Sequence, residues 1–278
     1  MSTGSRSELH PRLEASAAEV TGSHRRILGI DFYTGDVRGA IEFMCGNGGL
    51  LVVPAAPALK DLPTNAAYRE ALLNADLVIT DSAFMVMIWN RIEGDSLLRL
   101  SGLEYLSELL LLPEVRRPGN TFWIMAGPAS AKTNLTWLKG QGIDVPASHI
   151  YEAPMYGARI EDRVLVEKIN RLRPAHVVVT VGGGKQEALG LYLKRHLDYL
   201  PAIHCIGAAI AFLSGDQVRI PMWADRFWLG WLFRCLSAPS RFIPRYWSAR
   251  KLLPLMIRYR SRMPVCQPPA DSQSTEAA

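Results

Sequence analysis

The stretch AHVVVTVGGGKQE (175–187) begins with a run of β-branched residues and passes through three glycines into a helical pattern. An apolar run without polar alternation predicts a strand that is buried on both faces, as in a parallel sheet. The pattern of 186–197 predicts a helix directly after the glycines. Residues 175–197 therefore predict a strand, a tight turn and a helix, which is the repeating unit of an α/β fold.

Similar units flank this stretch along the chain. The other predicted strands are 26–30, 50–54, 76–80, 121–126 and 202–207, and the predicted helices are 36–45, 66–74, 82–92, 103–112, 129–140, 160–172 and 186–197. This alternation predicts a Rossmann-like, mostly parallel sheet sandwiched by helices. Ligands of such sheets bind at the carboxyl ends of the strands. The segments at these ends are 54–59, 80–83, 126–130, 181–187 and 207–210.

The composition is that of a folded globular chain of 278 residues, with 49% hydrophobic and 21% charged residues. Residues 1–24 and 263–278 are poor in apolar runs, so we expect disorder there. No window holds the roughly 18 apolar residues of a membrane-spanning helix. The four cysteines are scattered without CxxC spacing, which argues against a structural zinc site or a disulfide framework and fits a reducing cytoplasm.

The chain changes character after the predicted α/β domain of residues 25–215. Within the predicted appendage, 216–262, the part 219–262 holds nine arginines and one lysine against a single acid, Asp225, and four of the seven tryptophans. We expect short helices here, separated by prolines, with Trp223, Phe227 and Trp231 on one helical face. Arginines interleaved with indoles predict an appendage that meets anionic phosphates and an apolar boundary together.

Asp81 directly follows the predicted strand 76–80 and precedes a predicted helix. A carboxylate at this position can cap the helix. It can also act as a general base at the ligand edge of the sheet. The sequence leaves both interpretations open.

Two further groups are candidates for binding anions. The run Gly182 to Glu187 lacks both the GxGxxG and the Walker spacing, so it predicts either a tight turn or an anion site at a helix N-terminus. Arg234, Arg241 and Arg245 lie seven and four residues apart in the appendage, and arginine suits bidentate phosphate contact. Arg99 precedes Ser101-Gly102 in a loop and is by itself a weaker candidate.

Several blocks occur together in one order: NAAYREALLNADLVITD (65–81), RLSGLE (99–104), GKQE (184–187), IGAAIAFLSG (206–215) and RIPMW to RY (219–246). In this the chain resembles the WecG/TagA/CpsF glycosyltransferases, glycosyltransferase family 26, from about residue 27 to 246. The resemblance implies inverting, metal-independent transfer of a sugar from a UDP-sugar donor to a polyprenyl-diphosphate-linked glycan acceptor in cell-surface or extracellular polysaccharide biosynthesis. It also implies a protein peripheral to the cytoplasmic face of the cell membrane.

The resemblance also implies roles for individual residues. Asp81 falls on the family's catalytic base. The implied substrate-binding residues are Arg99, Gly102, Gly183, Lys185, Gln186, Glu187, Arg234, Arg241 and Arg245. In the family the appendage covers the pocket, contacts the nucleotide diphosphate and attaches the protein to the membrane. We therefore expect an anionic membrane surface as a partner, with a homo-oligomer as a further possibility.

The chain departs from the family pattern at the predicted pocket edge. The segment 53–58 reads VPAAPA, whereas the family has a Thr, an Asn and a His there. Three single residues also differ: Ser82 replaces a Gly, Gly184 replaces a Pro, and Glu104 replaces an Asp. Residues 208–212 lack an Asp that the family has. Altered donor or acceptor preference is the first explanation, and a catalytically altered or inactive, membrane-associated binding protein is the alternative. The glycine spacing argues against an NAD(P)-dependent oxidoreductase, and no nucleic-acid-binding motif is present.

Overall fold

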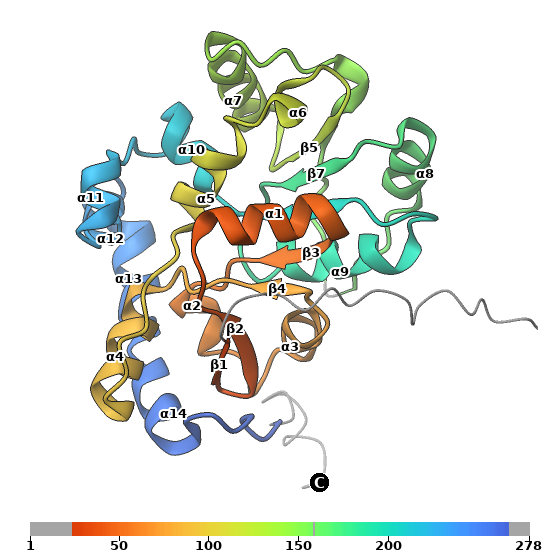
Figure 1. Ribbon diagram of the computed structural model, residues 1–278. Helices are drawn as coiled ribbons and strands as arrows, with labels where there is room; N and C mark the ends of the chain where they lie inside the picture. The colour runs from red at the N-terminus through yellow and green to blue at the C-terminus, as the bar shows by residue number, and fades with distance from the viewer. Residues whose placement is uncertain (1–23, 158, 267–278) are drawn as a thin grey trace, which may run out of the picture.

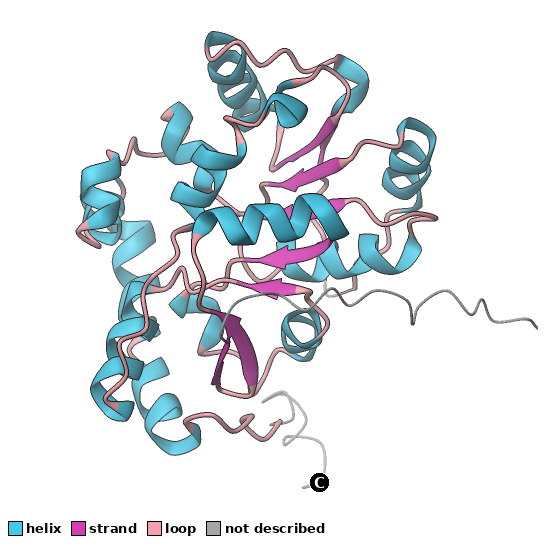
Figure 2. Cartoon of the chain, viewed as in Figure 1, coloured by secondary structure: helices cyan, strands magenta, loops and turns pink. Residues whose placement is uncertain are grey.

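The computed structural model describes residues 24–157 and 159–266. Within these residues, six strands form one all-parallel sheet in the order β4-β3-β8-β7-β5-β6 (Figures 1 and 2). The strands are β3 (Gly49–Val52), β4 (Leu77–Val78), β5 (Thr121–Met125), β6 (Ile150–Glu152), β7 (His176–Val179) and β8 (Ala202–Cys205). The prediction of a Rossmann-like α/β fold is therefore confirmed.

Helices cover both faces of this sheet, so its central strands are fully buried. Along β5, Phe122 and Ile124 join one apolar cluster, while Trp123 and Met125 join the other. The first cluster receives side chains from α3 (Ala66–Leu73), α4 (Ala83–Glu93), α8 (Arg163–Leu172), α9 (Gln186–His196) and α14 (Leu252–Tyr259). The second receives them from α1 (Val37–Asn47), α5 (Gly102–Leu109), α7 (Pro128–Gly140) and α10 (Ala209–Ser214). This two-sided burial explains why the strands read as continuous apolar runs.

The prediction of a first parallel strand at residues 26–30 is wrong. This segment contributes to an antiparallel hairpin of β1 (His24–Ile27) and β2 (Ile30–Tyr33), separate from the main sheet. Leu28 and Gly29 form its two-residue turn with φ of 51° and 77°, the left-handed pair that a tight hairpin turn requires. A short apolar run that conceals a turn cannot be distinguished from one continuous strand by its hydrophobicity.

Several short elements of the structure were not predicted from the sequence. β6 is three residues long and forms the sheet edge beside β5, and the sequence analysis did not predict it. Three short helices were also not predicted: α2 (Ala56–Leu59), α6 (Pro113–Arg116) and the 3-10 helix η1 (Ala147–His149). A helix of three or four residues makes about one turn, which is too short to show a helical period. β6 lacks the continuous buried apolar run that marks the other strands of the sheet.

The basic appendage is helical, as predicted, but its internal organisation differs from the prediction. It contains α11 (Met222–Arg226), α12 (Gly230–Ser237), α13 (Pro239–Ala249) and α14. Trp223 and Trp231 lie on different helices because the chain turns at Trp228, whose φ is 62°. Pro244 lies inside α13 and does not end it.

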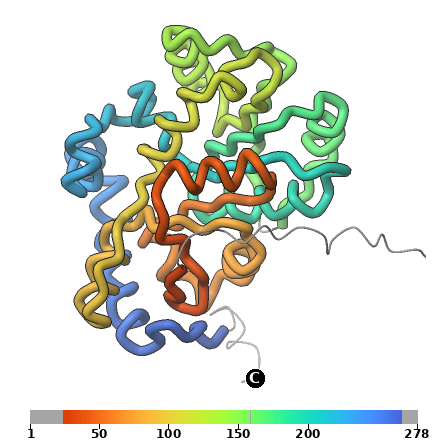
Figure 3. Tube along the Cα trace, viewed as in Figure 1, coloured from red at the N-terminus to blue at the C-terminus, as the bar shows by residue number. Residues whose placement is uncertain are grey.

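The end of the appendage is built into the core. Leu252 and Met256 of α14 are completely buried in the first apolar cluster. The backbone N–H groups of Leu28 and Gly29 donate to the carbonyls of Arg260 and Ser261, at 2.7 and 3.0 Å. The chain's last described turn therefore lies beside its first hairpin and α4, as the trace shows (Figure 3).

The two predicted disordered ends lie largely outside the described residues. His24 already belongs to β1, and residues 263–266 are described, with Met263 packed against the core. Among the described residues, no helix combines the length and the apolar character needed to cross a bilayer.

Candidate active site

A pocket of about 410 Å³ lies between the carboxyl end of β4 and the appendage helices. In Figure 1 the helices α11 to α13 lie on the side of the sheet toward which β3 and β4 point. The polar lining of the pocket comes from Asp81, Ser82, Arg99, Asp225, Arg234, Tyr246 and Arg250. Its apolar lining includes Trp228, Trp231 and Trp247 on the appendage and Ala55, Ala56 and Pro57 after β3. The appendage thus supplies one wall of this pocket, as the resemblance implied.

Asp81 is held at the end of β4 by contacts to only one of its carboxylate oxygens. Its Oδ1 accepts hydrogen bonds from the Arg99 guanidinium at 3.1 Å and from the Gly102 backbone N–H at 2.9 Å. The N-cap of α4 is Ser82, whose hydroxyl accepts from the Met85 N–H at 3.2 Å. The helix-capping interpretation of Asp81 is therefore wrong, and the interpretation as a general base stays a prediction.

Arg99 bridges the sheet and the appendage. Its Nη2 lies 3.1 Å from the Asp81 carboxylate and 3.0 Å from that of Asp225, and its Nε and Nη1 donate to the main-chain carbonyls of the same two residues. Burial lowers the pKa of Arg99, but the two carboxylates outweigh it and the pKa is raised overall. The guanidinium therefore stays charged and fixes the position of Asp81.

Asp225 is a site residue that the sequence analysis did not single out. Its side chain is 8% exposed and faces Arg99 from α11, 126 residues along the chain. The available signal was its standing as the only acid among the ten basic residues of 219–262. Because it shares Arg99 with Asp81, we regard Asp225 as a positioning residue.

Gly102 lies where a side chain would not fit. A Cβ at this position would come within 2.8 Å of Val53 Cγ1. The glycine allows its N–H to approach the Asp81 carboxylate, so its part in the site is to hold Asp81.

Arg234 is one of two appendage arginines that line the pocket, together with Arg250. Its guanidinium stacks over the Phe212 ring at 4.0 Å and donates to the Tyr246 hydroxyl at 3.1 Å. Its Nε–H is buried and has no hydrogen-bond partner among the described residues. A buried donor without a partner costs about 1–3 kcal/mol.

A second hollow, of about 360 Å³, adjoins the first and shares Pro57 with it. Gly183, Lys185 and Arg245 line it, together with Lys60, Asp61, Asn65, Tyr68 and Ser248. Lys185 already donates to the Gly157 carbonyl. Arg241 lines neither hollow and lies over the Phe242 ring, at 5.5 Å. The structure thus gathers most predicted binding residues around two adjoining hollows and leaves Arg241 outside both.

Gln186 and Glu187 lie behind the glycine turn and are buried. The Glu187 carboxylate accepts from the Gly184 N–H at 2.6 Å and from the Gln186 amide at 3.2 Å. Burial raises the pKa of Glu187 to about 6, although these hydrogen bonds and Arg245 act in the opposite direction. Glu187 therefore stabilises the glycine turn through its hydrogen bond to the Gly184 N–H. Gly183 and Lys185 line the hollow.

Glu187→Gln should remove a pH-dependent part of the free energy of unfolding. A pKa raised from 4.5 to about 6 on folding stabilises the folded state below pH 4.5, and this stabilisation is lost as pH rises through 6. The loss is about 2 kcal/mol. We expect urea unfolding at pH 4.5 and pH 7 to show the wild type losing about that much relative to the variant. Glu70→Gln, at an exposed pair with Arg195, is the control and should leave the pH dependence unchanged.

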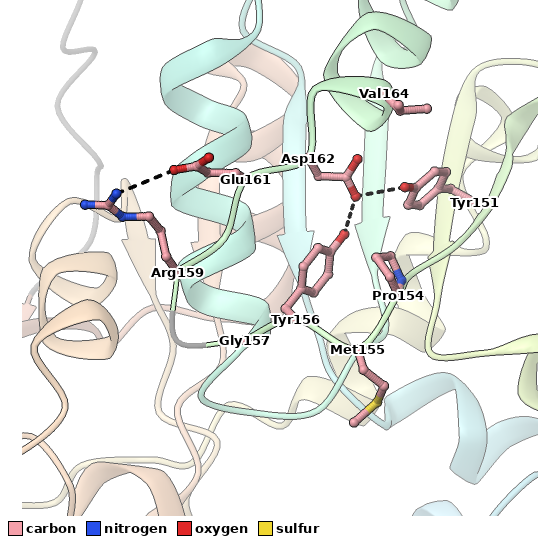
Figure 4. Close-up of a pocket in the computed structure, with 9 residues that line it drawn as sticks. All are labelled: Tyr151, Pro154, Met155, Tyr156, Gly157, Arg159, Glu161, Asp162 and Val164. Atoms are coloured by element: carbon pink, nitrogen blue, oxygen red, sulfur yellow. Dashed lines mark hydrogen bonds and ion pairs between the residues drawn. The ribbon is translucent and has the colours of Figure 1, made fainter.

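A third hollow, of about 530 Å³, follows β6. In Figure 4 Tyr151 and Tyr156 both point toward Asp162, and their hydroxyls donate to its Oδ2 at 2.8 and 2.7 Å. Oδ1 of the same carboxylate caps α8. Because these polar groups form hydrogen bonds with one another, we interpret their role in this hollow as structural.

The family of the chain follows from its similarity to known proteins. The glycosyl transferase WecG/TagA/CpsF family model matches residues 25–264. An N-acetylglucosaminyldiphosphoundecaprenol N-acetyl-beta-D-mannosaminyltransferase of Bacillus spizizenii is 27% identical over 210 residues, which are 73% of this chain and 79% of the relative. Proteins of the same name from Bacillus subtilis and Staphylococcus aureus are 26% and 22% identical, over 64% and 76% of this chain and 70% and 83% of theirs. Since the family match spans the sheet, the pocket and the appendage, the chain belongs to the WecG/TagA/CpsF family of glycosyltransferases.

Proposed function

We propose that this protein transfers a sugar from a UDP-sugar donor to a hydroxyl of a polyprenyl-diphosphate-linked glycan, with inversion at the anomeric carbon. The names of the relatives support an acceptor of the N-acetylglucosaminyldiphosphoundecaprenol type and a sugar of the N-acetylmannosamine class. The uronic acid of that sugar, and glucose, are the other donors that we would test.

The geometry of Asp81 carries this proposal. Both of its side-chain hydrogen bonds fall on Oδ1, and within the described residues Oδ2 accepts none. The side chain is 24% exposed in the pocket wall. A carboxylate that is fixed through one oxygen and open at the other is suited to accept a proton from a bound hydroxyl.

In the proposed reaction, Oδ2 of Asp81 takes the proton of the acceptor hydroxyl. The hydroxyl oxygen forms the new bond to the anomeric carbon as the bond from that carbon to the β-phosphate oxygen breaks. The electron pair of the broken bond stays on the phosphate, and UDP leaves. The charge that develops on the leaving diphosphate then requires stabilisation by fixed positive groups.

Appendage arginines are placed to supply this charge. Arg234 and Arg250 line the Asp81 pocket, and Arg245 lines the adjoining hollow. The Arg234 side chain lines the same pocket as Asp81, and a diphosphate oxygen there would accept hydrogen bonds from its guanidinium. Because arginines can fill the role that a divalent cation has in other transferases, we propose that transfer needs no metal.

We propose that the appendage also attaches the protein to the anionic, cytoplasmic face of the cell membrane. Aromatic side chains are exposed along α11 to α13, with Trp223 at 55%, Phe227 at 73% and Trp247 at 67%. Arg250 lies over the Trp247 ring at 4.1 Å. Exposed aromatic groups beside arginines fit the interface between headgroups and acyl chains. A homo-oligomer stays a prediction.

Phe227→Ser combined with Leu236→Ser should weaken binding to anionic vesicles about ten-fold or more, since each side chain loses burial in the bilayer. Neither residue lines the pocket, and both are more than 70% exposed. Co-sedimentation with phosphatidylserine-containing vesicles measures this effect. Leu111→Ser with Met155→Ser, two exposed apolar positions outside the appendage, is the matched control. Equal losses in both double variants would contradict attachment through the appendage.

The second candidate, a catalytically inactive binding protein, is favoured by one observation. Ala55, Ala56 and Pro57 give the pocket an apolar wall at the segment where the family has polar side chains. Each hydrogen bond that is missing here would remove about 0.5–1.5 kcal/mol from the free energy that holds the sugar in its orientation. The same wall would accept a donor that carries fewer polar groups.

A panel of UDP-sugars, each tested with and without a polyprenyl-diphosphate-linked N-acetylglucosamine acceptor, distinguishes these functions. We expect acceptor-dependent UDP release with one donor, unchanged by a chelator such as EDTA. No response on titration with any UDP-sugar would instead support the inactive binding protein, and saturable binding of a UDP-sugar would count against it. The absence of any UDP-sugar binding would contradict the proposed function.

A further inference from the structure

A second group of reactive side chains lies at the opposite edge of the sheet, where the strands begin. Cys45 lies near the end of α1, Glu114 lies on α6, and His176 is the first residue of β7. Each offers one ligand atom, and these atoms all lie within 4.8 Å of one another. Because α1 leads into β3 and α6 leads into β5, all three elements meet at the amino-terminal edge. The group is therefore separate from the Asp81 pocket.

His176 is backed by a buried chain of hydrogen bonds. Its Nδ1 lies 3.2 Å from Nε2 of His204, and Nδ1 of His204 lies 2.9 Å from the Tyr105 hydroxyl. His204 and Tyr105 are completely buried, and His176 is 3% exposed. Burial lowers the pKa of both histidines, so both rings are neutral. A histidine that binds a metal commonly has its other ring nitrogen held in this manner.

The chain of bonds can present a lone pair to a metal. If Nδ1–H of His176 donates to His204, then Nδ1–H of His204 donates to the Tyr105 oxygen. Nε2 of His176 is then unprotonated and can act as a ligand. The proton arrangement that a metal requires is thus compatible with every contact in this buried row.

We propose that Cys45, Glu114 and His176 form a binding site for a borderline divalent cation of the Zn²⁺ type, with water as the fourth ligand. Thiolate, imidazole and carboxylate form a ligand set that Zn²⁺ accepts. Ligand atoms around tetrahedral Zn²⁺ lie roughly 3.3–3.6 Å apart, so the three groups need to approach by about 1 Å. Cys45 and Glu114 are exposed and can make this movement, while His176 is fixed by its partners.

The site would join three elements that are distant in the sequence. Without metal, Cys45 is a free thiol whose proton lies on the sulfur beside the Glu114 carboxylate. Metal binding displaces that proton to solvent and forms the bond to sulfur, with no change in oxidation state. The cation would link α1, α6 and β7 and stabilise the folded chain. It would take no part in sugar transfer, because it lies at the edge of the sheet away from Asp81.

The test uses the full chain after chelator treatment, titrated with Zn²⁺ by calorimetry and with Co²⁺ by absorption spectroscopy. We expect one site per chain, with thiolate-to-cobalt charge-transfer absorption and an increase in unfolding temperature on Zn²⁺ addition. Cys45→Ser and Glu114→Gln should each weaken binding by about 10–100-fold or more, and Cys45→Ser should abolish the charge-transfer absorption.

Cys266→Ser and Glu108→Gln are the matched controls, since both positions are exposed and lie outside the group. They should leave affinity and spectrum unchanged. The proposal is overturned if the wild type shows no saturable Zn²⁺ binding, or if Cys45→Ser binds Zn²⁺ as tightly as the wild type. Both outcomes are independent of whether the protein transfers a sugar.

Discussion

Asp81→Asn should reduce turnover about 10²–10⁴-fold while UDP-sugar affinity changes little. The amide oxygen can still accept from Arg99 and from the Gly102 N–H, which fix the side chain through Oδ1 in the wild type. The nitrogen that replaces Oδ2 cannot take a proton from the acceptor. UDP release with the lipid-linked acceptor measures turnover, and titration of the donor measures affinity.

Asp198→Asn is the control for this substitution. Asp198 pairs with Arg173 at the surface, with both side chains more than half exposed, and lies outside the described pockets. Its replacement should leave turnover unchanged. If Asp81→Asn retained wild-type turnover, Asp81 would not be the base, and the proposed mechanism would be wrong.

Arg99→Met should lower the free energy of unfolding by about 3 kcal/mol or more and abolish transfer. The guanidinium is 13% exposed and pairs with two carboxylates, those of Asp81 at 24% and Asp225 at 8% exposure. Its removal leaves two like charges near one another with no cation between them. Urea unfolding monitored by circular dichroism measures the loss of stability.

Two comparisons separate this effect from the general loss of a surface arginine. Arg173→Met removes an exposed ion pair and a contact with the Tyr199 ring, and should change stability by no more than about 1 kcal/mol. Arg99→Met combined with Asp225→Asn should recover part of the stability, since it removes one of the unpaired charges. A loss in Arg99→Met no larger than in Arg173→Met would show that the bridge between sheet and appendage contributes little.

Point substitutions are preferable to deletion of the appendage. Leu252 and Met256 are completely buried in the core, and the carbonyls of residues 260 and 261 hold the β1–β2 turn. Removing residues 219–278 would therefore expose the main apolar cluster, and lost activity would not distinguish a catalytic role from unfolding. Substitution of Arg234 leaves this packing in place.

Features that depend on neighbouring residues could be predicted from the sequence, whereas contacts between residues far apart in the chain could not. The β-branched run of 177–181 predicted a buried strand correctly, because burial on both faces leaves its mark in a few consecutive residues. The same reasoning failed for 26–30, where the turn at Leu28 and Gly29 divides an apolar run. Two of the family blocks contain Asp81 and Arg99, but the residues that contact them could not be identified from these blocks.

The sequence by itself determined the fold class, the family and the presence of a basic, aromatic appendage. These properties are written in short windows and in composition, where local backbone preference and burial act directly. Only the tertiary structure decided that Ser82 caps α4 and Asp81 does not, that Asp225 shares Arg99 with Asp81, and that Arg241 lies outside both hollows. It also brought together Cys45, Glu114 and His176. Such meetings join residues far apart in the chain, and they depend on how the helices pack on the sheet, which no local pattern records.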